Sequence, residues 1–391
     1  MLEDADLKSR FSLKVENFAP NDPNGISPLG SDLKIMAANI ETKNKMMKEC
    51  KRRLALQQMP KFLLGGEYGS GKTHMANFVA NSLDDQYPNK VEIVRIDIGE
   101  IHQKTGFEYL YEKIINNFFS LEKLREIHDL WIAKKAADAA PNPYTTSESD
   151  LAKIFNKVGN EDAGRSVAKL IQRYDENVAK QGWSEIKAII HDSAEKVRML
   201  DALSNFFTQG TGKYLMMVID QGNNLITVNN KDSISSWLTA ALEMAEDSNS
   251  SFGWIIIVGT DGDTPEWWQN DQVKTRLGGS VSAAIQDLTA LDDPEMLQQF
   301  LIELLDQTTD SAEIQKRWDD SAPGYTSQDI NGETFDCNKY PFTKEAFDQY
   351  VEDWYAQNDP ARVHLSNLSQ MCVEVSFDDR HFITLSDIVQ P

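Results

Sequence analysis

The feature that most constrains this chain is the glycine-rich stretch GGEYGSGKTH at residues 65–74. Residues 66–73 fit the pattern G-x-x-x-x-G-K-[ST]; an apolar run at 61–64 precedes them and a helix-forming run at 75–80 follows. A strand, a glycine-rich loop and a helix in this order make a phosphate-binding loop. The glycines let successive backbone N–H groups converge on phosphate oxygens, and the helix directs its positive end at the same anion. The pattern therefore predicts a nucleoside triphosphate site, and its context disfavours a chance glycine-rich turn.

Two side chains of this loop have expected chemical roles. Lys72 would reach the β- and γ-phosphates of ATP, and the Thr73 hydroxyl would hold Mg²⁺. The nucleotide-binding residues predicted from the loop are Gly66, Glu67, Tyr68, Gly69, Ser70, Gly71, Lys72, Thr73 and His74.

An acid is expected near the Mg²⁺, at the end of another buried strand. The continuous apolar run at 214–219 is typical of a buried parallel strand, and Asp220 follows it directly. Ligands bind at the carboxyl ends of strands in open α/β sheets, so we assign Asp220 to the metal. The alternative is an aspartate that only begins a turn.

Gln221 comes next, at a position where many ATPases of this kind carry a glutamate that polarises the attacking water. Glutamine can hydrogen-bond a water but cannot take its proton. Three interpretations stay open: hydrolysis is naturally slow, another residue positions the water, or the chain is a Glu→Gln variant that holds ATP in place.

Strands that alternate with helices predict an α/β fold, a parallel P-loop NTPase sheet flanked by helices. Two further strands are expected at 91–98 and 254–260, with a helix near 233–245. Thr260, at the tip of its strand, would contact the γ-phosphate or the water, or would only cap the turn at 261–263.

Two other regions have mainly helical patterns. The stretch from about 100 to 213 is expected to be a helical insertion that protrudes from the sheet, with helices at 107–136, 149–158, 163–180 and 184–207. After residue 291 no strand is expected. Apolar faces at helical spacing predict helices at 294–307, 343–358 and 363–375, joined by an irregular polar connection at 308–342.

Charge and cysteine content restrict the partners and the compartment. The chain has 39 Lys and Arg against 61 Asp and Glu, a formal charge of −22, so most of its surface repels nucleic acid. The exception is a basic cluster at residues 43–53, which is either a solvated helix face or a surface that follows a DNA backbone. Its cations are Lys43, Lys45, Lys48, Arg52 and Arg53.

Three widely spaced cysteines fit neither a disulfide framework nor a zinc site, so they favour the cytoplasm. Neither a membrane span nor a signal peptide is recognisable.

With these motifs the chain resembles the AAA+ ATPases, and within them the initiator clade of origin-recognition and helicase-loading ATPases. It is similar in particular to the P-loop ATPases of bacterial phage-exclusion (BREX-type) defence islands. The resemblance rests on GEYGSGKTH, VIDQGNN, IIIVGTDG and the stretch IQDLTALDDPEMLQQFLIELL, with NDPARVHLSNLSQ and FITLSDIV near the end. It implies an AAA+ nucleotide-binding domain at 1–290 and a helical lid at 291–391.

The resemblance also implies roles for two arginines. Arg362, in DPAR, would be a sensor that touches the γ-phosphate of its own subunit. Arg276, in QVKTRLGG, would be a finger that reaches the ATP of a neighbour and makes hydrolysis depend on homo-oligomerisation. Each has the alternative of a surface arginine paired with nearby acids. The winged-helix domain that usually follows the lid of initiators is not expected here.

Three functions remain open. The first is an ATPase that assembles with ATP and acts as a switch or remodeller in a phage-defence complex, with a nuclease or other defence subunits as partners. The second is a DNA-binding matchmaker, such as a helicase loader or a transposition regulator. The third is a scaffold that binds ATP without hydrolysing it, for which Gln221 is the main support.

Overall fold

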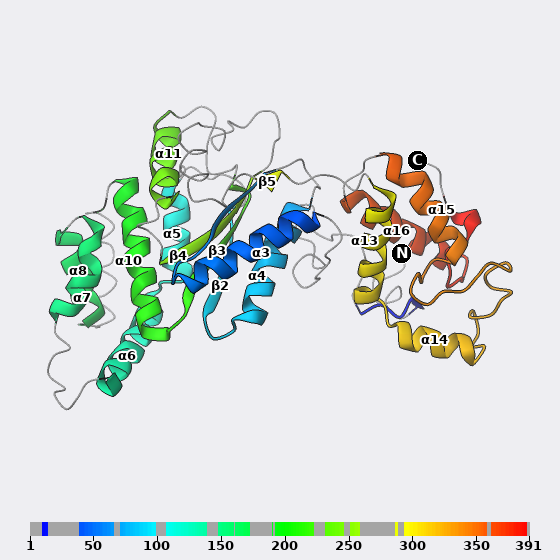
Figure 1. Cartoon of the computed structure of the whole chain (residues 1–391), viewed down its shortest axis with the longest axis horizontal. Helices are drawn as coiled ribbons and strands as arrows, with labels where there is room; N and C mark the ends of the chain where they lie inside the picture. The colour runs from blue at the N-terminus through cyan, green and yellow to red at the C-terminus, as the bar shows by residue number, and fades with distance from the viewer. Residues whose placement is uncertain are drawn as a thin grey trace. The chain divides into compact units, whose positions relative to one another are not determined.

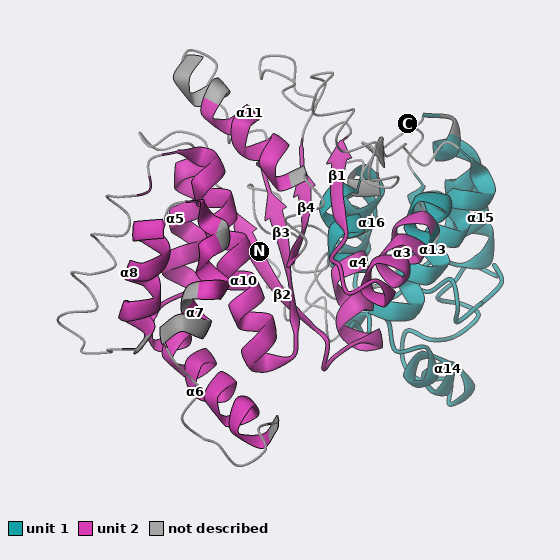
Figure 2. Cartoon of the chain, turned by 60° about the vertical axis from the view of Figure 1, so that its left-hand side comes forward, with its two compact units in different colours: residues 1–44, 66–78, 287–391 teal, residues 45–65, 79–286 magenta. Residues whose placement is uncertain are grey.

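The computed structural model describes residues 10–14, 39–65, 71–98, 107–138, 148–159, 161–172, 190, 192–222, 231–245, 251–258, 286–287, 293–357 and 361–388. The chain divides into two compact units, drawn in separate colours in Figure 2. The helical unit comprises residues 1–44, 66–78 and 287–391, and the sheet unit comprises residues 45–65 and 79–286.

The sheet unit is built on a sheet whose strand order is β2-β3-β4-β1-β5. Its strands are β1 (Lys61–Gly65), β2 (Val91–Asp97), β3 (Tyr214–Asp220), β4 (Phe252–Ile257) and the two-residue β5 (Gln286–Asp287). The pairs β2–β3, β3–β4 and β1–β4 are all parallel. β1 and β4 are buried along their whole length, which explains their continuous apolar sequences. The expected fold class, a parallel α/β sheet flanked by helices, is confirmed.

Helices surround this sheet, and in Figures 1 and 2 the strands lie between α10 on one side and α4 on the other. Helix α10 packs against β3 and β4; it begins after Asp192, whose carboxylate accepts from the Ala194 amide, and ends at Gly212 in the left-handed conformation. The helices are α3 (Ile40–Ala55), α4 (Lys72–Gln86), α5 (Phe107–Asn117), α6 (Leu121–Asp138), α7 (Glu148–Phe155), η1 (Asn156–Val158), α8 (Glu161–Gln172), α10 (Ser193–Thr211) and α11 (Lys231–Ala245).

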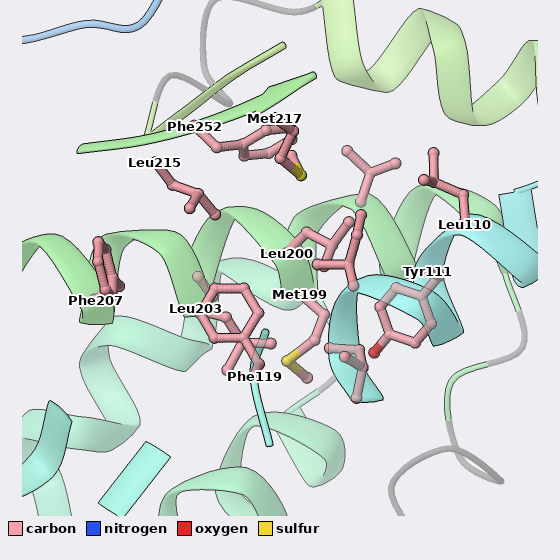
Figure 3. Close-up of a cluster of buried hydrophobic side chains, with 14 of the residues drawn as sticks. Leu110, Tyr111, Phe119, Met199, Leu200, Leu203, Phe207, Leu215, Met217 and Phe252 are labelled. Atoms are coloured by element: carbon pink, nitrogen blue, oxygen red, sulfur yellow. The ribbon is translucent and has the colours of Figure 1, made fainter. Parts of the chain in front are cut away.

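The expectation that the helices between β2 and β3 protrude from the sheet is wrong for α5 and α10. Both helices bury apolar side chains in the core that also contains the sheet residues, so they are the layer that covers one of its faces. Figure 3 shows part of this core, in which side chains of α5 and α10 pack with side chains of β3 and β4 and with Phe119. The labelled residues are Leu110, Tyr111, Phe119, Met199, Leu200, Leu203, Phe207, Leu215, Met217 and Phe252.

The single helix expected at 107–136 is two helices in the structure. Ser120 starts the second one, because its hydroxyl accepts from the Lys123 amide and its carbonyl accepts from the Leu124 amide. Phe119, just before this cap, is fully buried and has its ring centroid 4.9 Å from that of Phe118. The apolar pattern continues across the break, which explains why the sequence suggested one helix.

The helical unit has its own apolar core, built from α13 to α16 and the segments between them. Its elements are α13 (Pro294–Thr308), α14 (Ser311–Asp319), α15 (Lys344–Trp354), η4 (Tyr355–Gln357), α16 (Ala361–Phe377) and η5 (Leu385–Asp387). The expectation of an irregular connection at 308–342 is wrong in part, because this stretch contains α14. Asp310 caps the helix by accepting a hydrogen bond from the Glu313 amide. Buried Tyr325, Ile330 and Tyr340 anchor the rest of that connection in the core.

The segment at residues 10–14 also belongs to the helical unit. Leu13 pairs with Thr309 in an antiparallel bridge, and the Asp310 amide donates to the Ser12 carbonyl at 3.0 Å. Phe11 is fully buried, with its ring centroid 6.2 Å from that of Tyr340. Nothing in the sequence at 10–14 indicates this docking, because its partners lie near the opposite end of the chain.

Among the helices of the described residues, none combines the length and the apolar character that a membrane crossing requires.

Candidate functional site

The candidate site lies at the carboxyl edge of the parallel sheet. Because β1, β4 and β3 are parallel neighbours, their carboxyl ends meet at this edge. The hydrogen-bond ladder continues to the last residues of the strands: the Val258 amide donates to the Leu64 carbonyl at 2.9 Å, and the Ile98 amide donates to the Asp220 carbonyl at 3.3 Å. The backbone at the edge is therefore held in register up to Asp220.

The phosphate-loop motif is partly visible where it enters α4. Gly71 has a φ of +88°, and the Met75 amide donates to its carbonyl at 2.8 Å, so α4 begins directly after it. A Cβ at Gly71 would meet no atom within 4 Å, so the left-handed conformation, and not space, is what requires glycine here. Lys72, Thr73 and His74 form the first turn of α4 and are half-buried. Gly66, Glu67, Tyr68, Gly69 and Ser70 lie outside the described residues.

Asp220 and Gln221 form a constrained turn at the end of β3. The Gln221 amide donates to Asp220 Oδ1 at 2.7 Å, and Gln221 itself has a φ of +57°, in the left-handed region that costs a non-glycine residue about 1 kcal/mol. A Cβ at Gly222 would lie 2.5 Å from Ile256 Cγ2 and 2.9 Å from the Ile257 carbonyl, so the turn packs directly on β4. This packing holds the Gln221 backbone in place.

Asp97, which was not among the predicted site residues, is paired with Asp220. The β2–β3 register pairs Asp97 with Asp220, each as the last residue of its strand, and both are half-buried. Directly paired residues on neighbouring strands present their side chains on the same face, with the strands about 4.8 Å apart. The only sequence signal was that an aspartate follows the expected strand at 91–96, as one follows the apolar run at 214–219.

Besides residues 66–70, the structure does not place the side chains of three predicted site residues. Thr260 and Arg276 lie outside the described residues. Arg362 is the second residue of α16, and its side chain is not described. Two residues further along, His364 is fully buried and its Nδ1 lies 3.0 Å from the Tyr350 hydroxyl, which ties this end of α16 to α15.

The basic cluster at 43–53 lies on α3, and the structure separates its cations into two groups. Lys43 is 1% exposed and Arg53 is 8% exposed, so the expectation that these two face a DNA backbone is wrong. Arg53 is held inside because its Nε donates to Glu49 Oε1 at 2.8 Å, four residues away on the same helix. The cations that remain exposed, called the basic stripe below, are Lys45, Lys48, Lys51 and Arg52.

Lys43 lies in an environment that disfavours its charge. Its Nζ lies over the Phe78 ring, 5.2 Å from the centroid, in a cation–π contact that favours the charged form, but burial outweighs this contact. Burial lowers the pKa of Lys43 from its usual value of 10.5 to about 8, and the nearby negative charge of Glu303 opposes this shift. Below that pKa the folded chain therefore carries a buried positive charge.

Lys43 makes the stability of the chain depend on pH. The folded pKa is below the unfolded one, so the unfolded chain binds the proton more tightly and the free energy of unfolding rises with pH above about 8. We expect a gain of about 2 kcal/mol between about pH 7.5 and pH 9.5 that a Lys43→Met variant lacks. Urea unfolding of both proteins at the two pH values measures it, and equal changes in the two proteins would contradict this assignment.

Comparison with known proteins found similar solved structures only. Neither the family models nor the curated proteins contain a match to this sequence. The ORC2 protein of Aeropyrum pernix, solved in ADPNP–ADP complexes, is 10% identical over 94% of this chain and 68% of that chain, with a TM-score of 0.48. The Aeropyrum pernix ORC1 protein in complex with DNA is 8% identical over 91% and 67%, with a TM-score of 0.41. Cdc6p of Pyrobaculum aerophilum is 11% identical over 94% and 67%, with a TM-score of 0.44. The nucleotides and the DNA are features of those proteins, because similarity at this level does not transfer function.

Proposed function

We propose that this chain is an AAA+-type ATPase that binds ATP with Mg²⁺ at the carboxyl edge of its sheet. One observation carries the proposal: β1, which leads into the phosphate-loop motif, and β3, which ends in Asp220, are parallel strands of one sheet with only β4 between them. Open α/β sheets bind ligands at this edge, and the glycine-rich sequence supplies the backbone amides that phosphates require.

The side chains assigned to the metal fit Mg²⁺. A threonine hydroxyl (Thr73) and a carboxylate (Asp220) are oxygen donors, which Mg²⁺ prefers over nitrogen and sulfur. Mg²⁺ is commonly bound by one or two protein oxygens together with substrate phosphates and waters. When bound, the ion neutralises charge on the phosphates.

The remaining roles follow from the resemblance and the motif. Residues 66–74 would cradle the phosphates, with Lys72 on the β- and γ-phosphates, and Thr260 would contact the γ-phosphate or the water. Arg362, in a lid formed by residues 291–391, would sense the γ-phosphate of its own subunit. Arg276 would reach the ATP of a neighbouring subunit, so that hydrolysis requires an oligomer.

The biological setting we propose is a switch or remodeller in a bacterial phage-defence complex in the cytoplasm. The similarity of the motifs to those of BREX-type ATPases supports this setting. The formal charge of −22 favours protein partners, such as a nuclease or another defence subunit, over extended contact with nucleic acid.

A DNA-binding matchmaker is the second candidate, and the basic stripe on α3 favours it. Lys45, Lys48 and Lys51 are exposed and follow one another at helical spacing, so they present their charges along one face. Each phosphate that they neutralise would release counterions and make the binding depend on salt. Several copies in a ring or filament would add their stripes together.

Assembly of the intact chain tests the proposal. We expect the solution mass to rise from a monomer of 44.2 kDa to a multimer when Mg–ATP is added. A Lys45→Glu/Lys48→Glu/Lys51→Glu variant should assemble with ATP as the unmodified chain does, because the stripe is not part of the proposed nucleotide site. If DNA increases the mass further only when the stripe is intact, the matchmaker role is supported. If calorimetry detects no binding of Mg–ATP, the proposed function is excluded.

A further inference from the structure

The pairing of Asp97 with Asp220 places a second carboxylate near Gln221, which cannot act as a general base. ATP hydrolysis needs a group that takes a proton from the attacking water, and the amide of Gln221 cannot do so. The β2–β3 register places Asp97 next to Asp220, one position before Gln221, with the strands about 4.8 Å apart. A carboxylate is therefore present on the strand next to the one whose following residue, Gln221, lacks one.

We propose that Asp97 is the general base of the reaction, in place of the carboxylate that Gln221 lacks; this inference rests on the proposed ATPase function. As the water oxygen bonds to the γ-phosphorus, its proton moves to an Asp97 carboxylate oxygen. The bond from the γ-phosphorus to the bridging oxygen breaks, and its electron pair leaves on ADP. The proton then passes from Asp97 to solvent, so the products are ADP, inorganic phosphate and a proton.

The order of the strands supports this role over that of a metal ligand. Along the carboxyl edge the order is β1, β4, β3 and β2, so Asp97 lies beyond Asp220, on the side away from the strand that leads into the phosphate loop. In the proposed site, a triphosphate that begins at the loop and reaches Asp220 would have its γ-phosphate directed along this edge, away from β1. In-line attack requires the water on the side of the γ-phosphate opposite the leaving group, and with the γ-phosphate in that direction this would be the β2 side.

The surroundings of Asp97 hold its backbone in place. Lys113 of α5 donates its Nζ to the Asp97 carbonyl, and the amide of the next residue, Ile98, donates to the Asp220 carbonyl at 3.3 Å. Neither contact involves the Asp97 side chain, so a change in that side chain leaves both intact. The side chain is half-buried, which leaves it within reach of solvent for release of the proton.

The test is steady-state turnover of Mg–ATP by Asp97→Asn, an isosteric change, with Glu92→Gln as the matched control. Glu92 lies on the same strand toward its other end, where it forms an ion pair with Lys213 at 3.0 Å. We expect Asp97→Asn to lower kcat about 100-fold, as loss of a general base does, and Glu92→Gln to leave it unchanged. The affinity for Mg–ATP, measured by calorimetry, should change less than about threefold in both variants, because a base that acts on the water does not contribute to ground-state binding.

The same two measurements in a Gln221→Glu background test whether Asp97 takes the role of the missing carboxylate at position 221. A glutamate at 221 supplies its own carboxylate, so Asp97→Asn should then have little effect on kcat. If Asp97→Asn lowers kcat equally in both backgrounds, or if it weakens Mg–ATP binding about as much as it lowers kcat, Asp97 is not the base. Turnover that is undetectable in the unmodified chain while Mg–ATP binds would also overturn the inference, whereas absence of Mg–ATP binding would instead remove the proposed function.

Discussion

Replacing Lys72 with alanine lowers the affinity of this chain for Mg–ATP about 100-fold. Lys72 opens α4 directly after Gly71, and in the proposed site its ammonium makes charge-assisted hydrogen bonds to the β- and γ-phosphates. Loss of such contacts costs about 3 kcal/mol, which corresponds to the stated change in affinity. Isothermal titration calorimetry of the two proteins with Mg–ATP measures it.

Lys90→Ala is the matched control for Lys72→Ala. Lys90 is an exposed lysine in the turn between α4 and β2, and its backbone makes the ladder contact to Tyr214 that the substitution keeps. It should bind Mg–ATP as the unmodified chain does. Equal affinities of all three proteins would remove Lys72 from the site, and an equal loss in both variants would show that a general change in charge, and not a specific contact, lowers the affinity.

Gly253→Ala destabilises the sheet unit by about 3 kcal/mol. Gly253 lies in β4 between β3 and β1, and a Cβ there would be 2.5 Å from the Pro60 carbonyl oxygen and 2.8 Å from Met216 Sδ. The sulfur can move, but the carbonyl belongs to the backbone that receives the Trp254 amide at 3.2 Å. Overpacking at a fixed backbone costs 1–3 kcal/mol or more, so we expect a lower urea midpoint with an unchanged m-value.

Gly212→Ala is the control that separates the cost of a crowded Cβ from the cost of a strained backbone conformation. Gly212 ends α10 at a φ of +80°, and a Cβ there would meet no atom within 4 Å. Its substitution should therefore cost only about 1 kcal/mol, the strain of the left-handed conformation. A Gly253→Ala variant that is no less stable than Gly212→Ala would mean that β1 and β3 separate easily from β4.

The strands were predictable because buried parallel strands leave apolar runs in the sequence, and the partly exposed β2 keeps Val91, Ile93, Val94 and Ile96 between its charged residues. The runs at 61–64, 91–98 and 214–220 correspond to β1, β2 and β3, and the run at 254–260 overlaps β4, which begins at Phe252. Helix boundaries were less predictable, since the cap at Ser120 interrupts an apolar pattern that continues on both sides. Helix α14 was missed because only one of its side chains, Ile314, is buried and its pattern is almost entirely polar.

Some residues of the candidate site could also be predicted from the sequence, and others could not. Lys72, Thr73 and Asp220 were identified because a contiguous motif or the end of a single strand marks them, and their roles stay predictions until nucleotide binding is measured. Asp97 was missed because its significance depends on which strand lies beside β2. Lys43 and Arg53 were misassigned because the density of charge along a helix does not say which cations fold back onto Glu49 or become buried.

Local patterns in the sequence were enough to predict the parallel α/β class and the position of the phosphate-loop motif. Both follow from local patterns: apolar runs of strand length, and glycines at positions where the backbone must turn. Only the tertiary structure decided that Asp97 stands beside Asp220, that α5 and α10 cover the sheet, and that residues 10–14 pack with α13 and α14. The physical reason is that these arrangements join segments far apart in the chain, and long-range pairing is selected by packing of the whole core and not by the residues of either segment alone.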